Sequence, residues 1–302
     1  MRNEWGAKEW FEKQCNPANA NGLGDGWGHR WRGLQKFRHS QSLRLIKPII
    51  VRKGRSLTLL DIGCAFGDFT QKVWHLNPAN KVHGIDISEN AIGVVVRKYP
   101  QMEFSIGALP VLNFPDHTFD VVLCLEVLYY LDHSIWQEAL ASIRRVLKPQ
   151  GFVLISGPID SGRRYFDEKE LLLLLTSTGM KVKKVQYGYH RLYALMETRI
   201  RNLHKRVVLL RELFAMSKSE YEMWRKDKQH STRLLMVHTL RRIVAKIPLG
   251  QRMTSVFLGM CQHMLRYSIS AKAVPALFQT ATRILIGHRG LTNIMILARV
   301  RG

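Results

Sequence analysis

The chain has 302 residues, 46% of them hydrophobic, which is enough for a sizeable core in one or two domains. Lys and Arg number 46 against 23 Asp and Glu, a net charge of +23 that favours an anionic partner: nucleic acid, a membrane surface or a charged substrate. The four cysteines lack metal or disulfide spacing, and no apolar run reaches the ~18 residues of a spanning helix, so neither a metal centre nor a membrane span is expected.

The N-terminal part, residues 1–55, is aromatic and basic. No apolar leader follows its basic start, and we therefore expect a cytoplasmic protein. The glycine-rich stretch NANGLGDGWGHRW cannot form a regular helix or strand. The following stretch, LQKFRHSQSLRLIKPII, has the apolar spacing of a helix and is expected to end near Pro48.

From Ser56 onward, short apolar runs alternate with segments of helical periodicity. This alternation predicts an α/β fold with a parallel sheet covered on both faces. A strand with one exposed face is predicted in MKVKKVQYGY, and RLYALMETRI is a candidate for pairing with it. The apolar runs lie at 57–62, 82–87, 102–106, 119–125 and 151–156, and the helical segments at 68–76, 89–98, 134–147 and 167–178.

The remainder of the chain has helical periodicity, broken near Pro248 and Pro275. We therefore predict three parts: an N-terminal helical segment over 1–55, an α/β domain over 56–200, and a basic, mostly helical extension over 201–302. The extension carries much of the charge, because residues 229–302 contain 11 basic side chains and no acidic one.

The loop LLDIGCAFGDF follows the first predicted strand. Asp61 lies at the carboxyl end of that strand, where open α/β sheets bind ligands. Gly63 and Gly67 allow a sharp turn and a close approach of the backbone to a ligand. Because Asp61 and Asp68 would repel a diphosphate at this helix start, the ligand should lack phosphate and carry a positive group.

The second predicted strand ends in VHGIDIS, with Asp86 19 residues beyond Gly67. An acid about 20 residues past such a glycine loop accepts hydrogen bonds from ribose hydroxyls. An adenosine-like ribose, a cationic tail and no phosphate together describe S-adenosylmethionine.

Four stretches now form an ordered series over about residues 57–156: LLDIGCAFGDF, VHGIDIS, FPDHTFDVVLCLEVLYYLD and IRRVLKPQGFVLIS. In this order they resemble the motifs of class I S-adenosylmethionine-dependent methyltransferases of the type-11 group. The resemblance implies a Rossmann-like sheet of seven strands with the last strand antiparallel. It also implies that Asp61, Gly63 and Gly67 line the methionine end of the cofactor, that Asp86 holds the ribose and that Ile87 packs on the adenine.

One position departs from the family pattern. The family usually has an acid after the third strand that contacts the adenine amino group, and Ala108 stands there in this chain. Loss of one hydrogen bond, about 0.5–1.5 kcal/mol, weakens binding without excluding it. Leu109 can offer its backbone amide to the ring instead, and we include Cys64 and Leu125 among the cofactor-binding residues.

Methyl transfer requires alignment, and it requires a base only when the nucleophile is protonated. The candidates follow the fourth strand, in LEVLYYLDHSIW. His133 and Glu126 are the first choices for a base, with Tyr129 as a further catalytic candidate. Tyr129 can equally pack over the cofactor, and Asp132 or Ser134 can cap the next helix. His117 is interpreted as a surface turn residue.

A weaker, local similarity links EVLYYL and the lead-in GDGWGHRW…LQKFRHSQSL to nodulation-type N-methyltransferases that modify amino sugars of lipo-oligosaccharides. It implies a sugar, glycolipid or other small-molecule acceptor methylated on nitrogen or oxygen. It also implies an N-terminal substrate lid, for which plain packing is the alternative. An RNA methyltransferase and a non-catalytic cofactor-binding scaffold remain open. The lid residues would be Trp27, His29, Arg30 and Trp31.

The stretch TRLLMVHTLRRIVAKI gathers its apolar side chains largely on one helical face. A basic amphipathic helix can lie on an anionic membrane, but the same pattern describes a helix packed on a core. We predict that residues 229–302 hold the protein near an anionic surface, at the inner face of the membrane, and do not complete the catalytic centre. RNA is the less favoured partner, because the segment has few aromatic residues for stacking.

Overall fold

The computed structural model describes residues 8–16, 32–51, 55–159, 165–189, 191–216, 219–220, 250–271, 274–277, 280 and 293–301. The chain divides into two compact units, one of Met1–Arg191 with Pro275–Gly302 and the other of Leu192–Val274. Among the described helices, none has the length and apolar character needed to cross a membrane.

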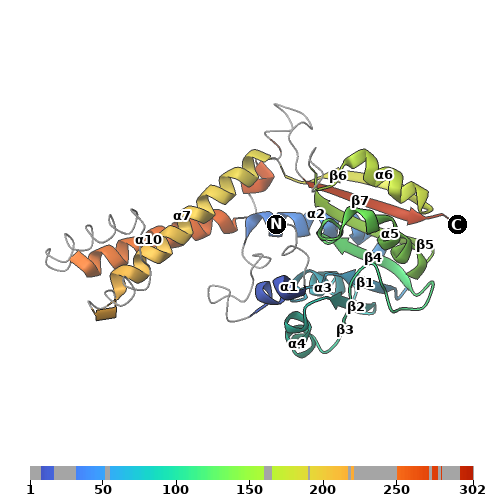
Figure 1. Cartoon of the computed structure of the whole chain (residues 1–302), viewed down its shortest axis with the longest axis horizontal. Coiled ribbons are helices and arrows are strands. Elements are labelled where there is room, and N and C mark those ends of the chain that lie inside the picture. The colour runs from blue at the N-terminus through green and yellow to red at the C-terminus, as the bar shows by residue number, and fades with distance from the viewer. Residues whose placement is uncertain are drawn as a thin grey trace. The chain divides into compact units, whose positions relative to one another are not determined.

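The first unit is built on a seven-stranded sheet with the order β3-β2-β1-β4-β5-β7-β6 (Figure 1). The pairs among β1 to β5 are parallel, and β7 is antiparallel to both β5 and β6. The predicted α/β fold with an antiparallel last strand is therefore confirmed. The strands are β1 (Thr58–Ile62), β2 (Lys81–Asp86), β3 (Glu103–Ile106), β4 (Phe119–Leu125), β5 (Leu147–Pro158), β6 (Met180–Tyr187) and β7 (Asn293–Val300).

Helices cover both faces of the sheet. Successive side chains of a strand point to opposite faces, and here both sets are buried under helices. Leu60 and Val122 pack in the cluster that holds α5 (Trp136–Val146) and α6 (Glu168–Ser177). Their neighbours Leu59 and Val121 pack with α2, α3 and α4. These three helices are α2 (Gly33–Ile50), α3 (Asp68–Trp74) and α4 (Glu89–Lys98); α2 continues past Pro48 to Ile50. Shorter elements are α1 (Lys8–Gln14) and the 3₁₀ turns η2 (Leu128–Tyr130) and η3 (His133–Ile135).

The strand that completes the sheet differs from the expected one. Residues 191–200, the candidate for pairing with β6, instead begin the helix α7 (Arg191–Ala215). The partner of β6 is β7, which lies within the range predicted as a mostly helical extension. The reason is that residues 294–298, IMILA, form a continuous apolar run buried on both faces, and periodicity does not distinguish such a strand from a buried helix.

The second unit contains most of α7 and all of α10 (Gly250–Ser270). Val207 and Phe214 of α7 share a buried cluster with Leu258 of α10. Arg211 Nη1 also donates a hydrogen bond to Gln262 Oε1 over 2.9 Å. The amphipathic helix predicted over 232–247 lies outside the described residues.

Candidate functional site

The loop between β1 and α3 turns at two glycines. Gly63 has φ +73°, and a Cβ there would lie 2.4 Å from Val127 Cγ2. Gly67, the N-cap of α3, has φ +70°, and its Cβ would lie 2.6 Å from Val95 Cγ2. Positive φ and the lack of space both demand glycine at these positions. The loop is also tied to β2, because the Gly63 amide donates to the carbonyl of Ile85 over 2.8 Å.

Asp61 is a buried carboxyl group at the end of β1. Thr70 Oγ1, in the first turn of α3, donates to its Oδ2 over 2.6 Å. The pKa of Asp61 is raised from 3.8 to about 7 in total: burial raises it most, the Thr70 hydrogen bond lowers it, and the charge of Asp86 raises it. A cation at this carboxylate would favour the ionised form and offset the cost of burial.

Asp86, at the end of β2, joins that strand to the glycine loop. Its Oδ2 accepts a hydrogen bond from the Ala65 amide over 2.8 Å, and its Oδ1 accepts one from the Ser88 amide over 3.0 Å. Burial raises the pKa of Asp86, and these hydrogen bonds act in the opposite direction. A carboxylate offers about four lone-pair sites, so both oxygens can accept a further hydroxyl. Ile87 follows and is half-buried.

The remaining predicted cofactor residues surround the ends of these strands. Leu109 is buried, and Ala108 beside it is half-buried. Their loop is attached to β2 where the Gly107 amide donates to the Asp86 carbonyl over 3.0 Å. Cys64 is buried as well, and burial raises the pKa of its thiol well above the usual value. A thiol with a raised pKa is a poor nucleophile, and the cofactor-binding role of Cys64 stays a prediction.

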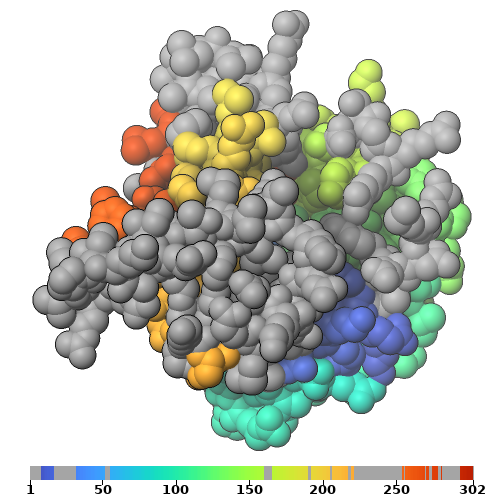
Figure 2. Space-filling model, turned by 60° about the vertical axis from the view of Figure 1, so that its left-hand side comes forward, coloured from blue at the N-terminus to red at the C-terminus, as the bar shows by residue number. Residues whose placement is uncertain are grey.

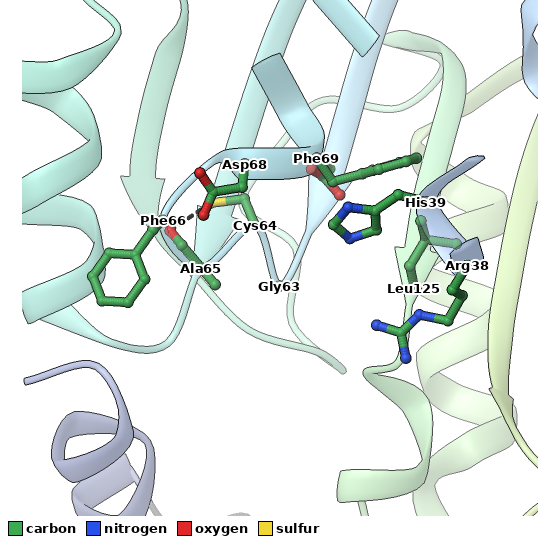
Figure 3. Close-up of a pocket in the computed structure, with 10 residues that line it drawn as sticks. Arg38, His39, Gly63, Cys64, Ala65, Phe66, Asp68, Phe69 and Leu125 are labelled. Carbon is green, nitrogen blue, oxygen red and sulfur yellow. Dashed lines mark hydrogen bonds between the residues drawn. The ribbon is translucent and has the colours of Figure 1, made fainter. Parts of the chain in front are cut away.

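A pocket opens beside the glycine loop and is lined by residues of opposite charge (Figure 3). Arg38 and His39 of α2 lie on one side of it, together with Leu125 at the end of β4. The sequence did not single out either basic residue, although both lie inside the helix predicted from LQKFRHSQSLRLIKPII. The other residues that line the pocket come from β1, the glycine loop and the start of α3; they are Asp61, Gly63, Cys64, Ala65, Phe66, Asp68 and Phe69.

Arg38 forms a largely buried ion pair with Glu126, the residue after β4. Arg38 Nη1 lies 2.9 Å from Glu126 Oε2, with 9% and 12% of the two side chains exposed. Glu126 Oε1 accepts hydrogen bonds from Ser156 Oγ and Asn293 Nδ2, each over 2.9 Å. Both oxygens of Glu126 therefore have charged or polar partners already, and its role as a base stays a prediction.

The two other candidate catalytic residues do not line this pocket. Tyr129 packs in a ring cluster, 4.5 Å from Tyr130 between centroids, and burial raises its pKa well above the usual value. His133 is half exposed, and its Nε2 lies 2.9 Å from Glu170 Oε1 of α6. Asp132 caps η3 by accepting from the Ser134 amide, as the alternative interpretation held. Catalysis by His133 or Tyr129 remains a prediction.

Helix α1 joins two parts of the site region. Glu12 accepts hydrogen bonds from Ser88 Oγ over 2.9 Å and from the Glu89 amide over 2.6 Å, at the start of α4. The rings of Trp10 and Phe11 contact Tyr130 at centroid distances of 5.9 and 5.1 Å. Figure 2 shows the blue surface of the N-terminal residues against the turquoise surface of the α4 region. The predicted lid residues lie outside the described ranges; they are Trp27, His29, Arg30 and Trp31.

Comparison with known proteins agrees with this geometry. A family model described as a methyltransferase domain matches residues 59–151. A probable S-adenosylmethionine-dependent methyltransferase of Mycolicibacterium smegmatis is 29% identical over 147 residues, 44% of this chain and 55% of that protein. Nodulation protein S of Sinorhizobium fredii is 27% identical over 169 residues, 53% of this chain and 75% of that protein.

In fold, the chain is similar to the cyclase SpnF, with a TM-score of 0.50 at 16% identity over 88% of this chain and 82% of that one. The chain spans about half or less of the first curated relatives it matches, namely 35%, 55% and 40% of their lengths. The glycine loop, the two carboxylates and the family match coincide in one stretch of sequence. Residues 59–151 accordingly match a methyltransferase domain, and the sheet that contains them is Rossmann-like.

Proposed function

We propose that this chain is an S-adenosylmethionine-dependent methyltransferase, and one observation carries the proposal. A single pocket has the buried carboxyl of Asp61 on one side and the guanidinium of Arg38 on the other. S-adenosylmethionine ends in an α-amino acid, with an ammonium and a carboxylate. The lining thus fits the cofactor, with Asp61 facing the ammonium and Arg38 the carboxylate.

The ribose end of the cofactor fits the other carboxylate. Asp86 has lone pairs left after its hydrogen bonds from the Ala65 and Ser88 amides, which suits a vicinal diol. Asp68 at the start of α3 is a further negative group in the pocket lining, so a diphosphate would be repelled there. These features favour a nucleoside without phosphate over a dinucleotide.

When bound, S-adenosylmethionine supplies an electrophilic methyl group on a sulfonium. The residues of the chain hold the two ends of the cofactor and limit its orientation, which is the main requirement of an in-line displacement. Glu126 has its oxygens engaged by Arg38, Ser156 and Asn293, so it is poorly placed to take a proton. This arrangement supports an acceptor with a free lone pair, such as a neutral amine, although hydroxyl methylation with His133 as base is the competing case.

For the acceptor, we propose a sugar, a glycolipid or another small molecule. Trp10, Phe11, Tyr129 and Tyr130 form a continuous set of ring contacts next to the end of β4. Aromatic rings stack on sugar faces, which supports a glycan, but they also stack on RNA bases, the second class of acceptor. Labelled methyl transfer into fractionated cell extract separates these cases. Label in glycolipid or small metabolites supports the proposal. Label found chiefly in RNA would make RNA the favoured acceptor.

Calorimetry with S-adenosylhomocysteine tests the cofactor directly. We expect binding by the wild type and its near loss in Asp86→Ala, because the ribose hydroxyls then lose their acceptor. Tighter binding of NAD would contradict the proposal. Cofactor binding with no methyl transfer to any fraction would favour the scaffold interpretation.

A surface feature of α10 favours an additional role at an anionic membrane. Five large apolar side chains of this helix are 62% to 76% exposed. At 100° per residue they share an arc of about 100°, opposite the residues that pack on α7. His263 and Arg266 of α10 are exposed too, and the helix contains no acidic residue. The apolar residues are Val256, Phe257, Met260, Met264 and Tyr267.

We propose that this face of α10 lies in the interface of an anionic bilayer, which places the protein at the inner face of the membrane. Binding to anionic liposomes should then fall steeply with salt, since screening acts over ~10 Å at 0.1 M. Met260→Glu should reduce binding, because it places a negative charge among the apolar side chains. Thr198→Glu adds the same charge to an exposed site on α7 and is the matched control. An equal loss of liposome binding in both variants would mean that the added charge alone matters. If the wild-type protein does not bind anionic liposomes, the membrane role is contradicted.

A further inference from the structure

Asn293 is a buried polar residue near the C-terminal end of the chain that reaches the site region. It begins β7, which runs antiparallel to β5 and pairs Asn293 with Pro158 at the end of that strand. Because β7 runs the opposite way, its first residue lies at the sheet edge where the parallel strands end and where the glycine loop begins. Asn293 Nδ2 there donates to Glu126 Oε1 over 2.9 Å.

The carboxylate of Glu126 is fixed from both sides. Ser156 Oγ and Asn293 Nδ2 hold Oε1, and Arg38 Nη1 lies 2.9 Å from Oε2. The backbone of Glu126 has φ +61°, which is costly for a residue with a Cβ, and its amide donates to the Ser156 carbonyl over 2.9 Å. Strain of this kind persists where surrounding contacts over-determine a conformation, as they do around Glu126.

Arg38 takes its orientation from this carboxylate. A guanidinium has five N–H donors on a flexible stem, so one fixed edge directs the others. Arg38 lines the pocket that contains the glycine loop, and its guanidinium is drawn beside Leu125 (Figure 3). We infer that Asn293 is a positioning residue, which acts through Glu126 on Arg38 and so sets the affinity of the site for the carboxylate end of the cofactor. The inference rests on the proposed function.

Fold stability alone gives a poor reason for an asparagine at this position. Its Oδ1 is buried, has no hydrogen-bond partner among the described residues, and lies 2.8 Å from the place a Cβ on Gly188 would take. A buried amide with one unsatisfied atom is destabilising relative to an apolar side chain of similar shape. The side-chain hydrogen bond that Asn293 donates goes to Glu126, which points to a role in that network.

Two ligands separate positioning from general damage. S-adenosylhomocysteine carries the amino-acid end, and methylthioadenosine has the same nucleoside and thioether without it. Asn293→Ala should weaken S-adenosylhomocysteine about tenfold by calorimetry, and methylthioadenosine less than about twofold, as expected for one hydrogen bond to a charged group. Arg38→Ala should show the same selectivity, and the double variant should show little further loss, because residues in one network are not additive.

The matched control is Asn80→Ala. Asn80 is another buried asparagine, whose Oδ1 accepts from the Leu57 amide over 2.9 Å at the opposite end of the sheet. It should lower the melting temperature and leave both affinities unchanged. If Asn293→Ala does not fold, Ser156→Ala carries the test, because it removes a single hydroxyl from Glu126.

Each outcome decides a separate claim. Selective loss for S-adenosylhomocysteine supports the positioning role of Asn293. If Asn293→Ala lowers the affinity for both ligands equally, or lowers neither, the inference is overturned and the proposed function is left intact. A wild-type protein that binds neither ligand overturns the proposed function, and the inference with it.

Discussion

A carboxyl group as deeply buried as that of Asp61 keeps its proton at a pH where an exposed aspartate has lost it. Its pKa is raised from 3.8 to about 7, chiefly by burial. Between these two values the native protein binds more protons than the unfolded chain, so the free energy of unfolding falls as pH rises through this window. Asp61→Asn should remove this contribution, and the difference in melting temperature between variant and wild type should grow from pH 4 to pH 7.

Cofactor binding should reverse that dependence. An ammonium beside Asp61 favours the ionised carboxylate, so affinity for S-adenosylhomocysteine should rise with pH by up to about tenfold per unit below pH 7. Calorimetry in two buffers of different ionisation enthalpy should detect proton release. Thr70→Val should move the dependence to higher pH, since the Thr70 hydrogen bond lowers the pKa of Asp61. Affinity that is flat with pH would place the ammonium elsewhere.

The same substitution, glycine to alanine, should change the stability of the protein in opposite directions at two positions. Gly63→Ala should destabilise the protein by several kcal/mol, at least about 1–2 from positive φ and more from the clash with Val127. Gly93→Ala should stabilise it by about 0.5–1 kcal/mol, because Gly93 is exposed within α4 and a Cβ there meets nothing. Chemical denaturation measures both, and similar effects of the two changes would contradict the loop conformation.

Among the elements, α1 is attached to α4 through Glu12. Glu12 caps the start of α4 from outside that helix, accepting from Ser88 and the Glu89 amide. Glu12→Ala should cost about 0.5–2 kcal/mol, as the loss of a cap does, and should increase hydrogen exchange over residues 8–16. Glu9→Ala changes an exposed glutamate of the same helix and is the control. Unchanged exchange in the Glu12 variant would show that contacts other than this cap hold α1.

Strand β7 determines how the chain can be shortened. A chain ending near residue 228 loses β7, which pairs with both β5 and β6, so we expect it not to fold. This corrects the expectation that residues 229–302 are separable from the catalytic centre, since Asn293 contacts Glu126. The reason is topological: a strand inside a sheet cannot be removed without exposing both neighbours.

For the whole molecule, the separable part should be the second unit alone. Replacing residues 192–274 with a long Gly/Ser linker keeps every strand of the sheet. This chain should bind S-adenosylhomocysteine with unchanged affinity and lose its binding to anionic liposomes, because α10 is absent. Retained liposome binding would assign the membrane contact to the first unit. Lost cofactor affinity would show that the second unit supports the site.

Much of the fold followed from local pattern. The strands β1 to β6 and the helices α3 to α6 lie close to their predicted ranges, because a parallel sheet buried on both faces produces short apolar runs that alternate with helices. The glycine loop and the positions of Asp61 and Asp86 could be predicted for the same reason, since the chemistry of a strand end is local in sequence.

The sequence by itself thus determined the sheet, the loop and the class of cofactor. Only the tertiary structure decided which segment became the last strand, because the apolar run within NIMILARV is compatible with a buried strand and with a buried helix. It also decided that Arg38, Glu126, Ser156 and Asn293 form one network, although up to 255 positions separate them in the chain. Contacts between such distant residues depend on strand order and direction, and no local pattern of residues contains that information.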